Sequence, residues 1–105
     1  MTSTHVEEAR RDALVERLFG ATIGAFDLCG VYIGDRLGLY RALAERGPAS
    51  AAELASAAGL HERYALEWLE QQAASAILDV VDAEDGVQRF VLPPGHAEAL
   101  LDEES

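Results

Sequence analysis

The 105-residue sequence contains no lysine, so its eight positive side chains are all arginines, set against nineteen carboxylates. The formal net charge is −11. From residue 51 onward only Arg63 and Arg89 oppose the acidic side chains, whereas the first fifty residues are nearly balanced. A field of this sign repels phosphate backbones and anionic lipid surfaces. The composition therefore argues against nucleic acid and membrane as partners.

Cysteine is almost missing as well. Cys29 is the only one, which excludes an intramolecular disulfide and makes a reducing compartment the simpler expectation. No basic segment precedes the apolar part of the chain, and no small-residue cleavage site follows it, so the sequence shows no signal peptide. We expect a cytoplasmic location. Cys29 itself is expected to be a small buried hydrophobe and not a nucleophile.

The sequence also lacks the patterns of a metal centre or a nucleotide site. No Gly-x-Gly-x-x-Gly opens a helix after a strand, and no glycine-rich phosphate loop is present. The histidines are far apart, without cysteines or carboxylates at metal-ligand spacing: His5, His61 and His96. We therefore expect no catalytic residue, no cofactor-binding residue and no metal site in this chain.

Residues 18–34, LFGATIGAFDLCGVYIG, form an apolar run with one charge, Asp27. Three interpretations are open: a membrane span, a buried core helix, or a surface covered by another chain. Spanning a membrane needs about twenty apolar residues, and this run is shorter and charged in the middle. Each of its four glycines costs about 1 kcal/mol inside a helix. They therefore indicate either close backbone approach or a break near Gly20–Gly24.

Apolar residues recur in this part of the chain at steps of three and four, which traces two neighbouring stripes on one helix. A helix so apolar needs cover on more than one side, and a small domain has little with which to bury both stripes. We predict that one stripe joins the core and that the other is a homodimer interface containing Phe19, Ile23, Phe26 and Ile33. A central core helix is the alternative.

Asp27 is the one charged residue in the apolar run of residues 18–34. Within an apolar helix, a carboxylate is expected to be paired, to cap a neighbouring segment or to face a wet pocket. Asp27 and Tyr32 are the residues that we name as candidates for lining a substrate pocket.

The remaining chain reads as short helices and a hairpin. A helix over Asp35–Arg46 is stopped by Gly47-Pro48, and Ser50 with Glu53 forms a capping box for a helix that closes at Gly59. A second helix is expected over residues 61–78. The segments DVVDA and VQRFVL flank Glu84-Asp85-Gly86, which favours a type I′ hairpin turn. A last helix follows Pro93-Pro94-Gly95.

Two helices joined by a tight glycine turn and followed by a hairpin make a winged helix-turn-helix. The predicted fold class is mainly α with a small β-hairpin, a winged helix-turn-helix preceded by one or more long apolar N-terminal helices. Such folds often bind DNA through arginines and lysines of the second helix. Here both the second helix and the wing are acidic, which opposes DNA binding.

The succession LGLYRAL…AELA…AGL…R…WLE, followed by an acidic hairpin and FVLPPGHAEALL, resembles the N-terminal region of class I S-adenosylmethionine-dependent methyltransferases, closest to bacterial O-methyltransferase-like enzymes. The resemblance covers residues 12–101. It implies a winged-helix domain that dimerises and forms part of a substrate-pocket wall, with the methyl donor held by a following Rossmann-like domain. The family usually has glycine after the second helix, where this chain has Ala76.

The resemblance implies the N-terminal dimerisation and substrate-pocket domain of a small-molecule methyltransferase, which has no catalysis of its own. It also implies that this chain binds no cofactor, whereas the full-length parent uses S-adenosylmethionine. Residues 1–11 are expected to be a flexible N-terminus, and 102–105 an acidic end leading to a missing catalytic domain. The alternative is a winged-helix transcriptional regulator or a protein-interaction module.

Overall fold

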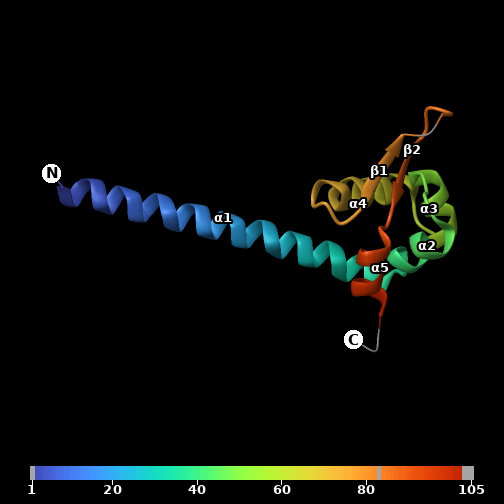
Figure 1. The fold of residues 1–105 in the computed structure, drawn as a ribbon, viewed down its shortest axis with the longest axis horizontal. Helices are drawn as coiled ribbons and strands as arrows, with labels where there is room; N and C mark the ends of the chain where they lie inside the picture. Colours follow the sequence, from blue (N-terminus) through green and yellow to red (C-terminus); the bar gives the residue numbers. More distant parts are fainter. Residues whose placement is uncertain (1, 83, 103–105) are drawn as a thin grey trace.

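The computed structural model describes residues 2–82 and 84–102 and confirms the predicted fold class, a mainly helical chain with one two-stranded hairpin (Figure 1). A long helix projects from a body made of the other elements. The order of the elements is α1 (Thr2–Arg36), α2 (Leu39–Arg46), α3 (Ala51–Ala58), α4 (Glu62–Ala74), β1 (Asp79–Asp82), β2 (Gln88–Val91) and α5 (Pro94–Leu101).

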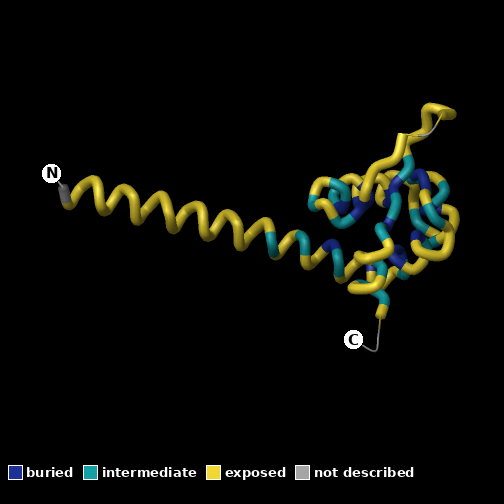
Figure 2. The backbone as a smooth tube through the Cα atoms, viewed as in Figure 1, coloured by how far each residue is buried: buried dark blue, intermediate teal, exposed yellow. Residues whose placement is uncertain are grey.

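Helix α1 is unbroken over 35 residues, so the break considered near Gly20–Gly24 is wrong. Every residue of the segment 3–23, here called the arm, is exposed (Figure 2). The arm is therefore not a core helix within this chain. No helix in the described part of the chain has the length and apolarity needed to cross a bilayer.

The start of α1 bears on the predicted domain boundaries. Residues 2–11, which the sequence analysis assigns to a flexible N-terminus, are the first turns of α1. Their mobility stays a prediction, and residue 1 lies outside the described residues. The acidic end at 102–105 is described only at Asp102, which follows α5.

The prediction of one helix over Asp35–Arg46 is wrong at its start. Helix α1 continues to Arg36, and α2 begins only at Leu39. Between them, Gly38 takes a left-handed conformation with φ of 70°, which ends one helix and redirects the chain into the next. This turn buries Leu39, Tyr40 and Leu43 in the body although the preceding helix is largely exposed.

The helix-turn-helix forms as its capping residues predict. The Ser50 hydroxyl accepts the Glu53 amide at 3.1 Å, and the Glu53 carboxylate accepts the Ser50 amide at 2.9 Å, which confirms the capping box of α3. Gly59 ends α3 with φ of 70°, and the Leu60 amide donates to the Ala55 carbonyl. The chain then enters α4 directly.

Helix α4 ends at Ala74, so the predicted helix over 61–78 is too long at its C-terminal end. The Ile77 amide donates to the Gln72 carbonyl and the Ala76 amide to the Ala73 carbonyl, which are the two bonds of a Schellman cap. Ala76 takes the left-handed position of that cap with φ of 60°, the one non-glycine residue with positive φ in the described part of the chain. Ala76, which stands where the similar methyltransferases usually have glycine, thus has the left-handed conformation that glycine prefers.

Substituting Ala76→Gly is therefore expected to stabilise the fold. A left-handed conformation costs a residue with a Cβ about 1–2 kcal/mol, whereas glycine adds unfolded-state entropy worth about 0.4–1 kcal/mol. The net expectation is a gain of about 1 kcal/mol in unfolding free energy, measured by urea denaturation at fixed protein concentration. Ala74→Gly, at the last residue of α4, should instead lose stability. A destabilised Ala76→Gly variant would contradict this account of the turn.

The wing is an antiparallel hairpin in which Val80 pairs with Phe90 and Val81 with Arg89. The predicted type I′ turn is wrong, because it requires positive φ at both central residues and only Gly86 has it. The Asp85 carboxylate instead accepts the Val87 amide at 3.0 Å and bonds the Arg89 guanidinium with both oxygens at 3.1 Å. The strands consequently end at Asp82 and resume at Gln88, with a longer loop between them.

The core lies where α2, α3 and α4 meet the hairpin. Ala49, between α2 and α3, exchanges two backbone hydrogen bonds with Phe90 of β2, which fastens the wing to the helices. The buried hydrophobic cluster contains Leu39, Tyr40, Leu43, Ala49, Leu54, Trp68, Leu69, Leu78, Phe90 and Leu92. Of these residues none comes from α1, so the long helix is attached to the body at its C-terminal part only.

Candidate functional site

The junction of α1 with α4 is a close helix contact made by two glycines. The indole N–H of Trp68 donates to the Gly30 carbonyl at 3.0 Å. A methyl group at Gly34 would lie 2.6 Å from Trp68 Cζ2 and 2.5 Å from Tyr40 Cε2, and one at Gly30 would lie 2.6 Å from the side-chain oxygen of Gln71. Close backbone approach, expected of the glycines, is therefore confirmed at these two, but the partner is α4 of the same chain.

A chain of polar side chains crosses this junction. The Tyr40 hydroxyl donates to Gln72, whose amide donates to the Gln71 oxygen at 2.6 Å. Gln71 in turn donates to Asp27 Oδ1 at 3.2 Å, and the Ser75 hydroxyl donates to the same oxygen at 2.6 Å. Burial raises the pKa of Tyr40 to about 12, so its hydroxyl keeps its proton at neutral pH. Asp27 is thus hydrogen-bonded to the end of α4, one of the arrangements expected for it.

Beside this junction the surface carries a groove of about 450 Å³ between α1 and α4. Its walls are largely apolar and aromatic, with one carboxylate. The lining residues are Phe26, Cys29, Gly30 and Ile33 of α1 and Tyr64, Glu67, Trp68 and Gln71 of α4. This groove is absent from the predictions made from the sequence, although Tyr64, Trp68 and Gln71 follow one another at steps of four and three, the spacing of a single helix face.

The predicted interface residues all lie on α1 and are all exposed in the chain. The exposed fractions are 67% for Phe19, 47% for Ile23, 69% for Phe26 and 44% for Ile33. Cys29, expected to be buried, is exposed and lines the groove between α1 and α4. Their role as a homodimer interface stays a prediction.

The two candidate substrate-pocket residues are not brought together. Asp27 faces α4 and has the hydrogen bonds described above, and Tyr32 is 64% exposed. Neither lines the groove between α1 and α4. Their pocket role stays a prediction.

The surfaces that would meet DNA in a winged helix carry arginines that are already bonded to carboxylates. Arg63 of α4 pairs with Glu67 at 3.3 Å. Arg89 of the wing bonds Glu53 at 3.0 Å as well as Asp85. The Ser50 amide, then Arg89 and Arg46, hold the pKa of Glu53 at about 2, so this carboxylate is charged throughout the physiological range. The arginines on these surfaces are therefore paired with carboxylates, in keeping with the net negative charge of the sequence.

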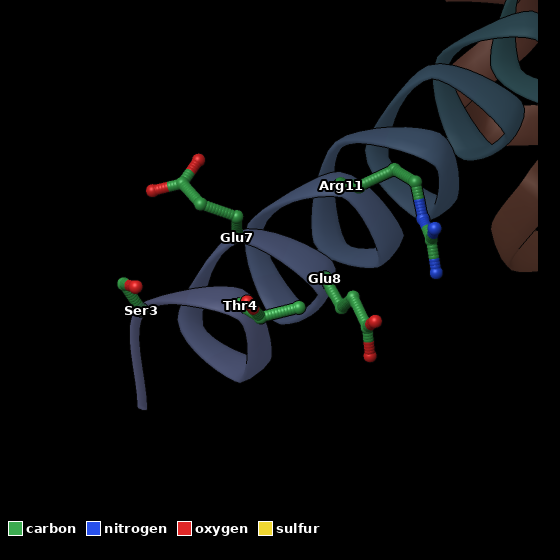
Figure 3. Close-up of a pocket in the computed structure, with 5 residues that line it drawn as sticks. All are labelled: Ser3, Thr4, Glu7, Glu8 and Arg11. Atoms are coloured by element: carbon green, nitrogen blue, oxygen red, sulfur yellow. The ribbon is translucent and has the colours of Figure 1, made fainter. Parts of the chain in front are cut away.

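A hollow at the tip of the arm does not amount to a binding site. Figure 3 shows its lining side chains, all from the first turns of α1, projecting outward with no second element opposite them: Ser3, Thr4, Glu7, Glu8 and Arg11. In the residues that the structure describes, no cluster of histidine, cysteine or carboxylate side chains could hold a metal ion.

A family model defines the class of protein. Residues 25–101 match the Rv2258c-like winged HTH domain, and the chain belongs to that family. The matched region begins within α1 and ends at the last residue of α5. It therefore contains the α1–α4 junction and the groove, while the whole arm precedes it.

Among solved structures, the chain is similar to the S-adenosylmethionine-dependent methyltransferase SibL, in its apo form, with 36% identity and a TM-score of 0.59. The match covers 86% of this chain and 24% of SibL, so the chain spans about a quarter of that enzyme's length, at its N-terminal region. No curated protein matches the sequence.

Two regulators share the fold at lower identity. One is BpsR of Bordetella bronchiseptica, a protein whose DNA binding is regulated by 6-hydroxynicotinic acid, with 18% identity, a TM-score of 0.57 and coverage of 80% of this chain and 69% of BpsR. The other is a MarR family transcription regulator, with 17% identity, a TM-score of 0.57 and coverage of 95% and 70%. At such identities the likeness shows the winged-helix fold alone.

Proposed function

We propose that this chain is the N-terminal dimerisation and substrate-pocket domain of an S-adenosylmethionine-dependent small-molecule methyltransferase. The observation that carries the proposal is the 36% identity to a region of SibL over 86% of the chain. The chain's own role is to hold two subunits together and to contribute one wall of a substrate pocket. The methyl donor is bound by a further domain of the parent protein.

The exposed apolar face of α1 supports the dimerisation part of this proposal. Phe19, Phe26 and Ile33 are 67%, 69% and 44% exposed, and burying side chains of this kind contributes about 1.5–3 kcal/mol each. A second copy of the same helix covers such a face by two-fold symmetry, which sets one patch against itself.

A winged-helix regulator is the second candidate, favoured by the overall fold. The charge distribution opposes DNA as its partner, because Glu62, Glu67 and Glu70 lie exposed on α4, where a recognition helix would contact phosphates. We therefore rank the methyltransferase domain first.

The test of the proposal is the reading frame that follows codon 105. We expect it to encode a strand, a Gly-x-Gly-x-Gly loop and an acidic residue about twenty positions later, the fingerprint of a dinucleotide-type fold. The isolated chain should give no heat with S-adenosylmethionine in a calorimetric titration, and micromolar affinity would contradict its assignment as a domain without cofactor residues. Specific retardation of one duplex sequence at physiological salt would promote the regulator.

A further inference from the structure

Six exposed residues of α1, five of them apolar and the sixth Thr22, form a regular row along the helix. Phe19, Phe26 and Ile33 are spaced by seven residues, and so are Val15, Thr22 and Cys29, which alternate with them at steps of four and three. These are the a and d positions of a heptad repeat, with Phe19 at an a position and Thr22 at the following d position. All six side chains, here called the seam, belong to exposed residues of one continuous helix.

The seam is symmetric about its middle. Its first and last members are Val15 and Ile33, so its midpoint is Gly24. A two-fold axis at that point would set each a position of one antiparallel helix opposite a d position of the other. The resulting layers are Val15 against the partner's Ile33, Phe19 against the partner's Cys29, and Thr22 against the partner's Phe26, each occurring twice.

The charges that continue the heptads on either side fit the antiparallel direction. Asp12 takes the a position before Phe19, and Arg36 takes the d position after Cys29. The same axis brings Asp12 opposite the partner's Arg36 at both ends of the seam. A parallel pair would instead set Asp12 against the partner's Asp12 and Arg36 against the partner's Arg36, which repels at both ends.

In this arrangement the arm of one copy lies opposite the groove of the other. On α1 it is lined by Phe26, Cys29 and Ile33, the half of the seam that lies against α4. Their counterparts across the axis are Thr22, Phe19 and Val15, the half that projects from the body as the arm. Each copy therefore has the groove at one end of the seam. The arm, whose backbone Figure 2 shows as exposed, carries the other end.

We infer that two copies of this chain pair through antiparallel α1 helices with their two-fold axis at Gly24, and that the arm of each copy lies in the groove between α1 and α4 of the other. This inference rests on the proposed homodimer and adds its direction, register and docking site. It places Gly20 and Gly24 at b and f positions, on the side of α1 away from the partner helix. Ile23 flanks the seam at an e position.

Disulfide trapping tests the register directly. Cysteines can join when their Cα atoms are about 4.4–6.8 Å apart. Phe19→Cys sets a thiol opposite the partner's Cys29, so mild oxidation with oxidised glutathione should give a covalent dimer on a non-reducing gel. In the wild-type chain the two Cys29 residues lie ten residues apart along the helix axis, or about 15 Å at 1.5 Å per residue, so no covalent dimer should form.

Phe19→Cys combined with Cys29→Ser is the matched control, since residue 19 of one copy is equally far from residue 19 of the other. It should stay uncrosslinked. A wild-type chain that crosslinks through Cys29 as readily as the Phe19→Cys variant would overturn the inference in favour of parallel helices. A Phe19→Cys variant that fails to crosslink would overturn the register.

The charges give a second readout that does not depend on oxidation. Asp12→Arg should weaken the dimer about fivefold, because it replaces an attraction by a repulsion at two exposed sites. Adding Arg36→Asp should restore the wild-type dissociation constant, measured by sedimentation. The double variant remaining as weak as Asp12→Arg would contradict the pairing.

Sedimentation of the reduced wild-type chain separates this inference from the proposed function. A dimer without the 19–29 crosslink retains the proposed homodimer and rejects the antiparallel register. A monomer at micromolar concentration rejects both.

Discussion

Phe26→Glu should convert the dimer into a folded monomer at micromolar concentration. Phe26 lies next to the two-fold axis, so the substitution places two carboxylates in the interface and removes two phenyl rings. Losing the burial of each ring costs about 1.5–3 kcal/mol, and a carboxylate without a partner adds to that cost. We expect a loss of at least about 4 kcal/mol, or about a thousandfold in the dissociation constant.

Leu28→Glu is the matched control for this prediction. Leu28 is 71% exposed, against 69% for Phe26, but lies outside the seam at a c position. Its charge should leave the mass measured by light scattering or sedimentation unchanged. If Leu28→Glu dissociates the dimer and Phe26→Glu does not, the interface is on another face of α1. A wild-type chain that runs as a well-folded monomer would show that a second copy does not cover the apolar face.

Gly34→Ala is expected to destabilise the attachment of α1 to the body. The new methyl carbon would lie 2.6 Å from Trp68 Cζ2 and 2.5 Å from Tyr40 Cε2, and both rings are buried and packed against each other with centroids 5.2 Å apart. Neither ring can move freely, and overpacking of this kind costs about 1–3 kcal/mol. The unfolding free energy from urea titration at fixed protein concentration should fall by about 2 kcal/mol.

Gly24→Ala in the same helix supplies the comparison. A methyl group there meets nothing within 4 Å, so the variant should gain helix propensity, worth about 1 kcal/mol. The two substitutions are chemically identical and should have opposite signs. Equal effects would mean that the glycine at position 34 does not determine the approach of α1 to α4.

Local sequence patterns determined much of the fold. Ser50 and Glu53 define the start of α3 because a capping box needs only residues within one turn. Gly59 defines its end for the same reason. The acidic character of α4 and the wing is likewise a property of the composition, and the structure adds only that Arg63 and Arg89 are bonded to carboxylates.

Tertiary contacts decided what these patterns left open. The glycines of α1 look alike in the sequence, yet Gly30 and Gly34 lie against α4 whereas Gly20 and Gly24 meet open space. The sequence placed two apolar stripes on one helix, but the body lies against the C-terminal part of α1 only, and both stripes keep exposed members, such as Leu18 and Leu28 in one and Phe19 and Phe26 in the other. The groove exists only because α4 lies beside α1. The Asp85 side chain likewise selected a longer loop over the tight turn that Asp-Gly favours, because its carboxylate bonds Val87 and Arg89.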